Sequence, residues 1–186
     1  MARIRRIEDD EVFDAAERVV IRMGMAGLSI DAVAKEAGIS KARVLYDFKS
    51  KAALLEALID RRLNADRRHT REAVEASSDT AHPELFGRIE AARPAFGHAD
   101  RVIMLAVNAA LSSRAELRNR FREWSREDLD AVVGNCCRSR AALMAYLALL
   151  GFYCTELFDF HRWDQAERLR ILDEIQTVFL SFPEPA

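Results

Sequence analysis

The chain has 186 residues, a formal net charge of −2, and a composition in which half of the residues are hydrophobic. This length suits one medium-sized domain, or a small domain joined to a larger one. The net charge excludes a general polycation, so nucleic-acid binding would have to rest on a local basic patch. Three cysteines, an odd number, and a charged N-terminus without a signal peptide favour a reducing, cytoplasmic location.

The composition predicts an all-α protein. Glycine and proline are few, with 7 and 4 residues, and long stretches consist of Ala, Leu, Arg and Glu. Alternating Val/Ile/Thr runs that would indicate strands are absent from the sequence. The longest nearly apolar run, Ala141–Cys154, has 14 residues, fewer than the roughly 20 that a membrane span needs. We therefore expect a buried helix there and no membrane partner.

Four helices are predicted in the first part of the chain. The first has an apolar face at helical spacing and ends in "MGMAG", where Gly24 and Gly27 can take a positive φ. Each of the other three follows a serine that can act as its N-cap: Ser29, Ser40 or Ser50. The predicted ranges are Asp10–Met23, Ser29 to Gly38, Lys41–Phe48 and Lys51–Arg71.

Further helices follow a break in composition at "ASSDTAHP" (Ala76–Pro83). One ends before Pro94, the next reads as buried, and a third is long and amphipathic. The last two are an almost wholly apolar helix and an amphipathic one. Their predicted ranges are 84–93, 98–113, 114–133, 140–160 and 164–182.

The spacing within Ser29–Phe48 is typical of a helix-turn-helix. Ala34 is small enough for two helices to cross closely, Gly38 supplies the turn, and Ile39 and Val44 fill the space between the helices. The second helix of such a motif enters the DNA major groove. Between Lys35 and Lys51 there are five basic and two acidic residues, a local charge of +3. The outward-facing residues on this second helix would be Lys41, Ala42, Arg43, Leu45 and Tyr46, and Lys49 and Lys51 would face phosphates.

The stretch "IDAVAKEAGISKARVLYDFKSKAALLEAL" resembles the DNA-binding domain of TetR-family transcriptional regulators. The resemblance covers about residues 9–63. It implies an all-helical homodimer that reads DNA with its third helix and binds an effector in its C-terminal part, which usually relieves repression. The implied organisation is a helix-turn-helix domain with an N-terminal arm, "ARIRR", at residues 1–62, and a helical effector-binding and dimerisation domain at 63–186.

Residue roles follow from the same resemblance. Ser29, Ser40, Tyr46 and Lys51 match phosphate-facing positions, and Lys41, Ala42 and Arg43 match base-facing ones. The chain departs from the family pattern at Leu45, which takes the usual tyrosine position, and at Asp47, which takes a histidine position. An acidic group near phosphates lowers affinity unless it is paired, and Lys51, four residues on, is a candidate partner for Asp47.

The last two predicted helices are the candidates for the interface of a homodimer. A helix that is apolar on all sides has to be buried on all sides, either inside the chain or against a second copy. Gly151 would allow close contact between helices. The candidate interface residues are Leu143, Leu147, Leu150, Gly151, Leu157, Leu172, Ile175 and Phe179.

The effector pocket is less well defined by the sequence. Asn108 lies within an apolar run, so its amide either contacts a ligand or bonds the neighbouring backbone. Glu156 is a polar residue on the apolar helix and would meet either a cationic effector, solvent or an interface. The candidate pocket residues are Phe96, Met104, Asn108, Leu111, Phe121, Trp124 and Tyr153, each of which could also be plain core.

Catalysis and metal binding have no support in the sequence. It contains no glycine-rich phosphate loop, no nucleophile elbow and no zinc-protease motif, and its four histidines are scattered. We expect no catalytic residue, no metal and no cofactor. The adjacent Cys136 and Cys137 are read as small helical residues rather than a redox switch. The expected function is a repressor that binds a palindromic DNA operator and is released by a small molecule; the alternatives are control by a protein partner, or activation.

Overall fold

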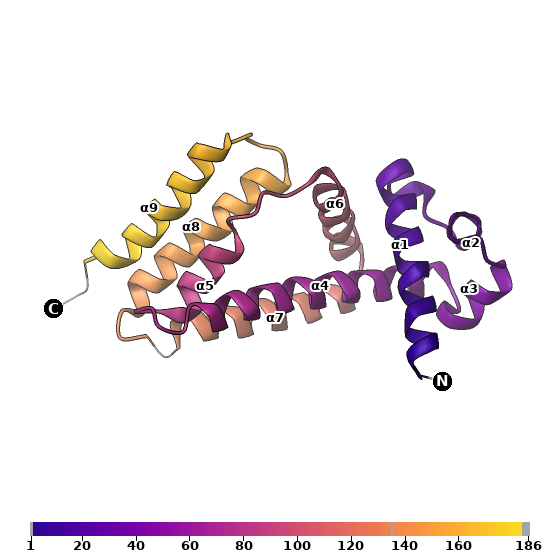
Figure 1. Ribbon diagram of the computed structural model, residues 1–186, viewed down its shortest axis with the longest axis horizontal. Helices are drawn as coiled ribbons and strands as arrows, with labels where there is room; N and C mark the ends of the chain where they lie inside the picture. Colours follow the sequence, from indigo (N-terminus) through magenta and orange to yellow (C-terminus); the bar gives the residue numbers. More distant parts are fainter. Residues whose placement is uncertain (1, 135, 184–186) are drawn as a thin grey trace. The chain divides into compact units, whose positions relative to one another are not determined.

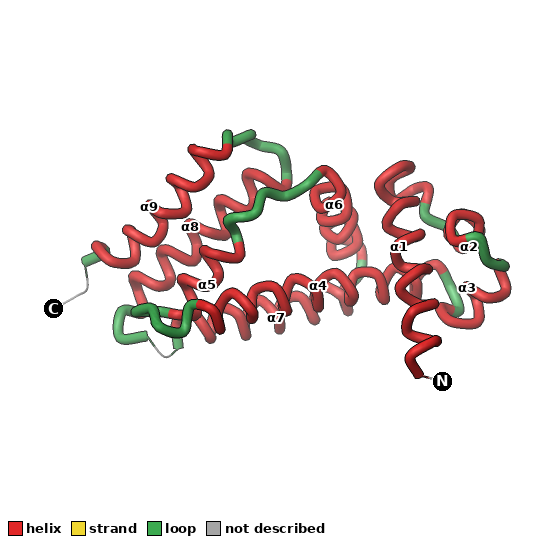
Figure 2. The backbone as a smooth tube through the Cα atoms, viewed as in Figure 1, coloured by secondary structure: helices red, strands yellow, loops and turns green. Residues whose placement is uncertain are grey.

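A computed structural model describes residues 2–134 and 136–183, with the side chains of residues 10–134 and 136–183 other than Ser113. Within these residues, helices α1 to α9 are joined by loops and there is no strand (Figures 1 and 2). The helices form two compact units, and the boundary between them falls inside α4 and again on either side of α6. The predicted all-α class is confirmed.

The first unit holds the N-terminal helices and one helix from later in the chain. The backbone of α1 leaves helical geometry at Gly24, where φ is 66°, as the sequence predicted for this glycine. Ser29, Ser40 and Ser50 each accept a hydrogen bond from a backbone N–H at the start of the helix that follows, and so act as N-caps. The unit comprises α1 (Ala2–Gly27), α2 (Ile30–Ala37), α3 (Lys41–Phe48), α4 (Lys51–Ala76) up to Asn64, and α6 (His98–Ser113).

Apolar stripes and ion pairs hold this unit together. Phe13 of α1 and Phe48 of α3 meet edge to face, with their ring centroids 5.3 Å apart. Arg61 of α4 pairs with Asp14 and Glu17 of α1 at 2.6 and 3.1 Å. The core residues come from all five helices and from the connection after α1, and they include Val19, Leu28, Val33, Val44, Leu54, Leu58, Ile103 and Val107.

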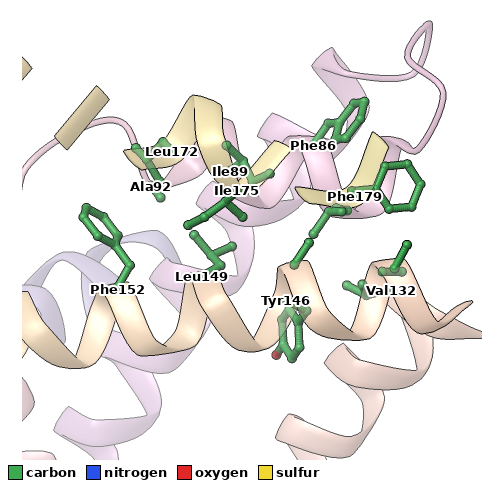
Figure 3. Close-up of a cluster of buried hydrophobic side chains, with 14 residues drawn as sticks. Phe86, Ile89, Ala92, Val132, Tyr146, Leu149, Phe152, Leu172, Ile175 and Phe179 are labelled. Carbon is green, nitrogen blue, oxygen red and sulfur yellow. The ribbon is translucent and has the colours of Figure 1, made fainter. Parts of the chain in front are cut away.

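The second unit is a bundle of the remaining helices. It comprises α4 from Ala65, α5 (Pro83–Ala91), α7 (Ala115–Val133), α8 (Ser139–Leu157) and α9 (Gln165–Ser181). Figure 3 shows Leu149 and Phe152 of α8 pointing toward the helices that carry Ile89 and Ile175. Asp164 and Glu167 form a capping box that begins α9. The buried cluster includes Leu85, Phe86, Ile89, Ala145, Leu149, Phe152, Leu172, Ile175 and Phe179.

Two contacts fix α5 within this bundle. Gly87 lies so close to α4 that a Cβ atom there would stand 2.4 Å from the Cα of Val74, so only glycine fits. Arg168 of α9 is 2% exposed and donates to the backbone carbonyls of Ala92 and Arg93, directly after α5. The same guanidinium pairs with Glu156 of α8 at 2.5 Å. Glu156 is therefore a structural residue that ties α8 to α9.

Helix α8 is long and apolar enough to cross a membrane by length and composition. The sequence had predicted otherwise, because its longest nearly apolar run there, Ala141–Cys154, has only 14 residues. Among the described helices α8 alone meets both criteria. One face of α8, with Ala141, Ala145, Leu149 and Phe152, is buried against α5 and α9, whereas Leu147 and Leu150 are exposed in the single chain.

The units differ from the division expected at residues 62 and 63. That boundary lies within α4, two residues before the one found here, but α6 belongs to the first unit rather than to the C-terminal region. The reason is the apolar face of α6, which places Ile103, Ala106 and Val107 in the core beside α1.

Candidate DNA-binding surface and ligand cleft

The turn between α2 and α3 has the geometry of a helix-turn-helix. Gly38 adopts a left-handed conformation with φ of 69°, and its N–H bonds the carbonyls of Ala34 and Lys35. The N–H of Ile39 also bonds the carbonyl of Ala34, at 3.0 Å. Val44 of α3 is fully buried beneath this turn. The chain thus leaves α2 through a glycine and enters α3 with one face anchored in the core.

The opposite face of α3 is open to solvent. Lys41, Ala42, Leu45 and Tyr46 are exposed there, and Tyr46 is 62% exposed despite its aromatic ring. Lys41 forms an ion pair with Asp31 of α2 at 3.0 Å. A short exposed helix with cations and an unburied aromatic ring is suited to a groove of DNA.

Arg43 and Asp47 lie one turn apart on α3 and form an ion pair. Nε of Arg43 is 3.2 Å from Oδ2 of Asp47, whose side chain is only 7% exposed. The expected pairing of Asp47 with Lys51 is therefore wrong: the carboxylate points along α3 toward Arg43 and not onward to α4. The acidic charge in the reading helix is compensated within that helix.

Further cations surround the end of α3 and the start of α4. Lys49 is exposed, with Nζ 5.0 Å from the centre of the Tyr46 ring, a cation–π contact. Lys51 is exposed at the first residue of α4, where backbone N–H groups also favour anions. The hydroxyls of Ser29 and Ser40 accept capping bonds from Ala32 and Arg43, so each retains a proton to donate to a phosphate. Cationic and hydroxyl groups suited to phosphates thus lie before α3 and around its end.

The N-terminal arm expected from "ARIRR" falls in a part of the chain whose side chains are not described. The backbone from Ala2 onward belongs to α1. A DNA contact by these arginines stays a prediction.

A cleft in the second unit has a volume of about 310 Å³. Such a volume is at the lower end of the range typical of small-molecule sites. Its lining is polar and charged, in contrast to the apolar set expected from the sequence. Helix α4 contributes Arg67, Thr70, Arg71 and Val74, helix α5 contributes Glu84 and Arg88, and helix α7 contributes Trp124, Glu127 and Asp128.

Arg88 is the centre of a buried hydrogen-bond network in this cleft. Its Nε donates to Asp128 at 3.0 Å, and its Nη1 donates to the carboxylate of Glu84 at 2.5 Å. Tyr146 of α8 donates its hydroxyl proton to Asp128 at 2.6 Å. Burial lowers the pKa of Arg88, but hydrogen bonds and charge from Asp128 and Glu84 outweigh this, so its pKa is raised. Burial and the bond to Asp128 raise the pKa of Tyr146, so the guanidinium stays charged and the phenol stays protonated at neutral pH.

The outer part of the cleft is less tightly paired. Arg67 of α4 reaches across to Glu127 of α7 at 2.5 Å, but the Glu127 side chain is 67% exposed. Arg71, one turn after Arg67 on the same helix, has no ion pair or hydrogen bond to any side chain in the described part of the chain. The cleft therefore combines a rigid floor with a cation at its entrance that has no anionic partner among those side chains.

The residues expected to line an effector pocket do not form one group. Trp124 lines the cleft, with Phe121 against it at a centroid distance of 5.1 Å. Phe96 and Tyr153 contact each other at 5.5 Å elsewhere in the second unit. Met104, Asn108 and Leu111 belong to α6 in the first unit. The Asn108 amide donates to the Met104 carbonyl at 2.9 Å, which is the structural alternative considered for this residue.

The expected dimer residues divide into two groups. Leu172, Ile175 and Phe179 are at most 5% exposed and pack inside the chain, so their inclusion in an interface is corrected: the apolar face of α9 covers α5 and α8. Leu147, Leu150 and Gly151 are exposed on α8, while Leu143 and Leu157 are half-buried. Exposed apolar residues on the same two helices that were not predicted are Met144 of α8 and Val178 and Leu180 of α9.

The cysteines and histidines form no candidate metal site among the described residues. Cys136 and Cys137 lie between the end of α7 and the start of α8, so the prediction that they are helical residues is wrong. Cys136 is half-buried and accepts a hydrogen bond from the backbone of Arg138, and Cys137 and Cys154 are exposed and free. His82 is buried, with Nε2 2.9 Å from the Val132 carbonyl. This hydrogen bond connects the residue before α5 to the last turn of α7.

The geometry of α2 and α3 is that of a helix-turn-helix DNA-binding protein, joined to a helical unit that carries a cleft. A family model for the N-terminal domain of bacterial regulatory proteins of the tetR family matches residues 12–58, and one for a tetracyclin repressor-like C-terminal domain matches residues 68–179. The chain belongs to the TetR family. It is accordingly a DNA-binding transcriptional regulator and not an enzyme.

Solved structures share the fold along nearly the whole chain. A putative TetR-family regulator from Mesorhizobium loti is 19% identical, with 95% of this chain and 96% of that chain covered at a TM-score of 0.70. A TetR regulator from Haloarcula marismortui is also 19% identical, with 95% and 98% covered at 0.70. The multidrug binding protein EbrR, complexed with malachite green, is 21% identical, with 90% and 96% covered at 0.69. No curated protein sequence matches the chain.

The charged residues of the cleft were not predicted, because the candidate pocket residues were sought among mainly apolar and aromatic side chains. One signal was present: Arg67, Thr70, Arg71 and Val74 recur at helical spacing after the apolar stripe of α4 has ended. That pattern marks one face of a helix that changes from apolar to polar. The pairing of Arg88 with Asp128, 40 residues apart, has no counterpart in local sequence.

Proposed function

We propose that this protein is a homodimeric repressor that binds a palindromic operator and is released from it by a small molecule bound in the cleft of α4, α5 and α7. The observation that carries the DNA-binding part is the exposed face of α3 behind the left-handed Gly38. On this proposal Lys41, Ala42 and Arg43 read bases. Ser29, Ser40, Leu45, Tyr46, Lys49 and Lys51 contact the DNA backbone or the groove wall. The protein would act in the cytoplasm, where bacterial DNA lies.

Dimerisation is supported by the exposed apolar residues of α8. Two reading helices need a separation of about 34–36 Å to enter successive major grooves on one face of DNA, which a single copy of this chain does not provide. Met144, Leu147 and Gly151 lie at successive turns of one face of α8 and are exposed in the single chain. We propose that this face pairs with its copy in the dimer. Val178 and Leu180 of α9 would extend the contact.

Release by an effector is supported by the cleft and by the continuity of α4. This helix begins at Lys51 with a proposed phosphate contact, and its residues Arg67 to Val74 line the cleft. A ligand that shifts the second half of α4 would thereby bias the first half. A differential stabilisation of ~3 kcal/mol would weaken DNA binding about 150-fold.

The test is selection of bound duplexes from a random pool by the purified full-length protein at about 150 mM salt, where non-specific binding is weak. We expect enrichment of a palindrome whose half-sites are about one helical turn apart. Enrichment of a single half-site would contradict the dimer, and no enrichment by a folded dimer would contradict autonomous operator binding. If nothing is enriched, control of DNA binding by a protein partner would explain the result better than autonomous operator binding. Whether the regulator represses or activates follows from the position of the selected site relative to its promoter.

A further inference from the structure

The cleft of α4, α5 and α7 has three carboxylates and three guanidinium groups in its lining, and their pairing is uneven. Asp128 accepts from Arg88 through Oδ1 and from Tyr146 through Oδ2, so both of its oxygens are engaged. Glu84 accepts from the same arginine at 2.5 Å. A cationic ligand would have to compete with a guanidinium that is already in place and buried.

Arg71 is the exception among these charges. Glu127, the third carboxylate, is taken by Arg67, which leaves Arg71 without an ion pair to the described side chains. Arg67 and Arg71 are four residues apart on α4, so their guanidinium groups extend from the same face of the helix. Thr70 stands between them on that face, with a hydroxyl able to donate to an anion. Two cations and a hydroxyl on one face match the oxygens of a carboxylate.

The wall opposite α4 provides a surface for a ring. Trp124 of α7 lines the cleft, and Phe121 supports its indole from the side at 5.1 Å. An indole face favours stacking with another planar group. A purely apolar ligand would, by contrast, remove water from the Arg71 guanidinium without supplying a partner, which opposes binding.

We propose that the cleft selects an aromatic carboxylate, held by Arg71 through its carboxylate and by Trp124 through its ring. The inference rests on the proposed effector function, since it names the class of molecule that the same cleft takes. Arg67 joins the carboxylate when Glu127, the most exposed acid of the lining, swings away. The rigid floor of Arg88, Asp128 and Glu84 limits how deep the ring can enter.

The test uses three probes of one shape and different charge: 2-naphthoate, 2-naphthamide and 2-(aminomethyl)naphthalene. Titration calorimetry on the full-length protein measures each dissociation constant. We expect the order anion, then neutral amide, then cation, from tightest to weakest. Equal affinities, a preference for the cation, or failure of the naphthoate to bind at millimolar concentration would each overturn the proposal.

Variants of α4 separate the cleft from general charge effects. Arg71→Gln should weaken naphthoate binding about 10- to 100-fold, as expected for loss of a hydrogen-bonded charge, while leaving the amide unchanged. Arg71→Lys should retain part of the affinity. Arg68→Gln is the matched control, because Arg68 is an exposed neighbour on α4 that does not line the cleft. An equal loss in the Arg68 and Arg71 variants would mean that the anion binds by overall charge and would refute the site.

A separate measurement distinguishes failure of this inference from failure of the proposed function. Binding of labelled operator DNA is followed with and without saturating naphthoate. Naphthoate that binds through Arg71 but leaves DNA affinity unchanged would support the ligand class and contradict release by an effector. DNA binding without any naphthoate binding would contradict the ligand class alone.

Discussion

Oδ2 of Asp47 lies 3.2 Å from Nε of Arg43, one helical turn earlier on the exposed helix α3. The carboxylate is almost buried, so it is fixed in position by the packing of α3. The contact is an ion pair by distance and not a hydrogen bond, because Oδ2 of Asp47 has no hydrogen-bond partner among the described residues. It holds the guanidinium of Arg43 beside Asp47, and the terminal amino groups of an arginine are those that donate to guanine N7 and O6 in a bidentate contact. We therefore expect Asp47 to act as a positioning residue for Arg43 instead of merely repelling phosphates.

Replacing Asp47 by Asn should lower sequence discrimination at one base position in each half-site. The preference for guanine at the base position that Arg43 contacts should fall about 10-fold. A bidentate arginine contact contributes about 1–3 kcal/mol of discrimination between bases. Competition binding against operators altered at single positions measures the effect. Asp31→Asn is the control, since it removes the same charge from the helix-turn-helix and breaks the ion pair with Lys41 instead of the one with Arg43. Uniformly tighter binding by Asp47→Asn at every position would show that Asp47 acts only by repulsion.

Lys51→Ala should weaken binding to operator and random DNA alike. Lys51 is exposed at the start of α4, and a phosphate contact carries no sequence information. The slope of log affinity against log salt concentration should become shallower by ~0.9 for each phosphate that the variant no longer neutralises. Arg122→Ala, the same change of charge on an exposed part of α7, should leave the slope unchanged. Weakening confined to the operator would place Lys51 against bases instead.

Leu147→Glu should shift the protein from dimer to monomer. Leu147 is 49% exposed on α8 in the single chain, and a buried, unpaired carboxylate at a paired helix face is unfavourable. Sedimentation velocity at several protein concentrations gives the dissociation constant. Leu105→Glu on α6 is matched in exposure, at 47%, and should leave the dimer intact. If both variants stay dimeric, the interface lies elsewhere.

Arg168→Met should lower the free energy of unfolding by about 3–5 kcal/mol, because Glu156 would keep a buried charge without its partner. Urea denaturation measures the change. Arg168→Met combined with Glu156→Met should recover much of the stability, since an apolar pair of similar volume often replaces a buried ion pair without cost. Arg170→Met on the exposed side of α9 should change stability by less than ~0.5 kcal/mol. A small effect of Arg168→Met would mean that water reaches the pair.

His82 should make stability fall with acidity. Burial lowers the pKa of this imidazole from its usual 6.5, although the hydrogen bond to Val132 and the charge of Glu84 oppose the change. The folded state then binds fewer protons than the unfolded state, so the contribution of His82 is complete above about pH 6.5 and is lost as the pH falls toward its lowered pKa. His82→Gln keeps a donor for the Val132 carbonyl without a titrating group. Denaturation from pH 7.5 to about 5 should give a flatter profile for the variant, and parallel profiles would assign the acid sensitivity to other groups.

Local signals in the sequence predicted the helix-turn-helix of α2 and α3 closely. The range of α3 was predicted to the residue for two reasons. Gly38 ends α2 with a positive φ, and Ser40 caps the start of α3. The start of α1 was placed too late, at Asp10, because the basic stretch "ARIRR" was interpreted as an arm that precedes the helix. The fold of this part follows from caps, turns and periodicity, all of which operate within a few residues.

The cleft and the interface depend on contacts between distant residues, which such signals do not encode. Leu172 and Leu147 look alike in sequence, yet one packs beneath α5 and α8 and the other is exposed. Asp47 had two basic residues at helical spacing, Arg43 and Lys51, and only the three-dimensional path of α3 into α4 decides between them. Side-chain partners across helices therefore had to be seen in the structure.

The close crossing at Gly87 and Val74 constrains how the cleft could be altered to accept other ligands. Any side chain at position 87 would push α4 and α5 apart, and Arg88 beside it is held by two carboxylates. Val74 of α4 and Gly87 and Arg88 of α5 are thus committed to the fold. Helix α7 is the wall where Trp124 and the exposed Glu127 can be exchanged without disturbing the bundle. A library for biosensor engineering would be most productive there, and natural divergence in ligand choice should be concentrated on the same helix.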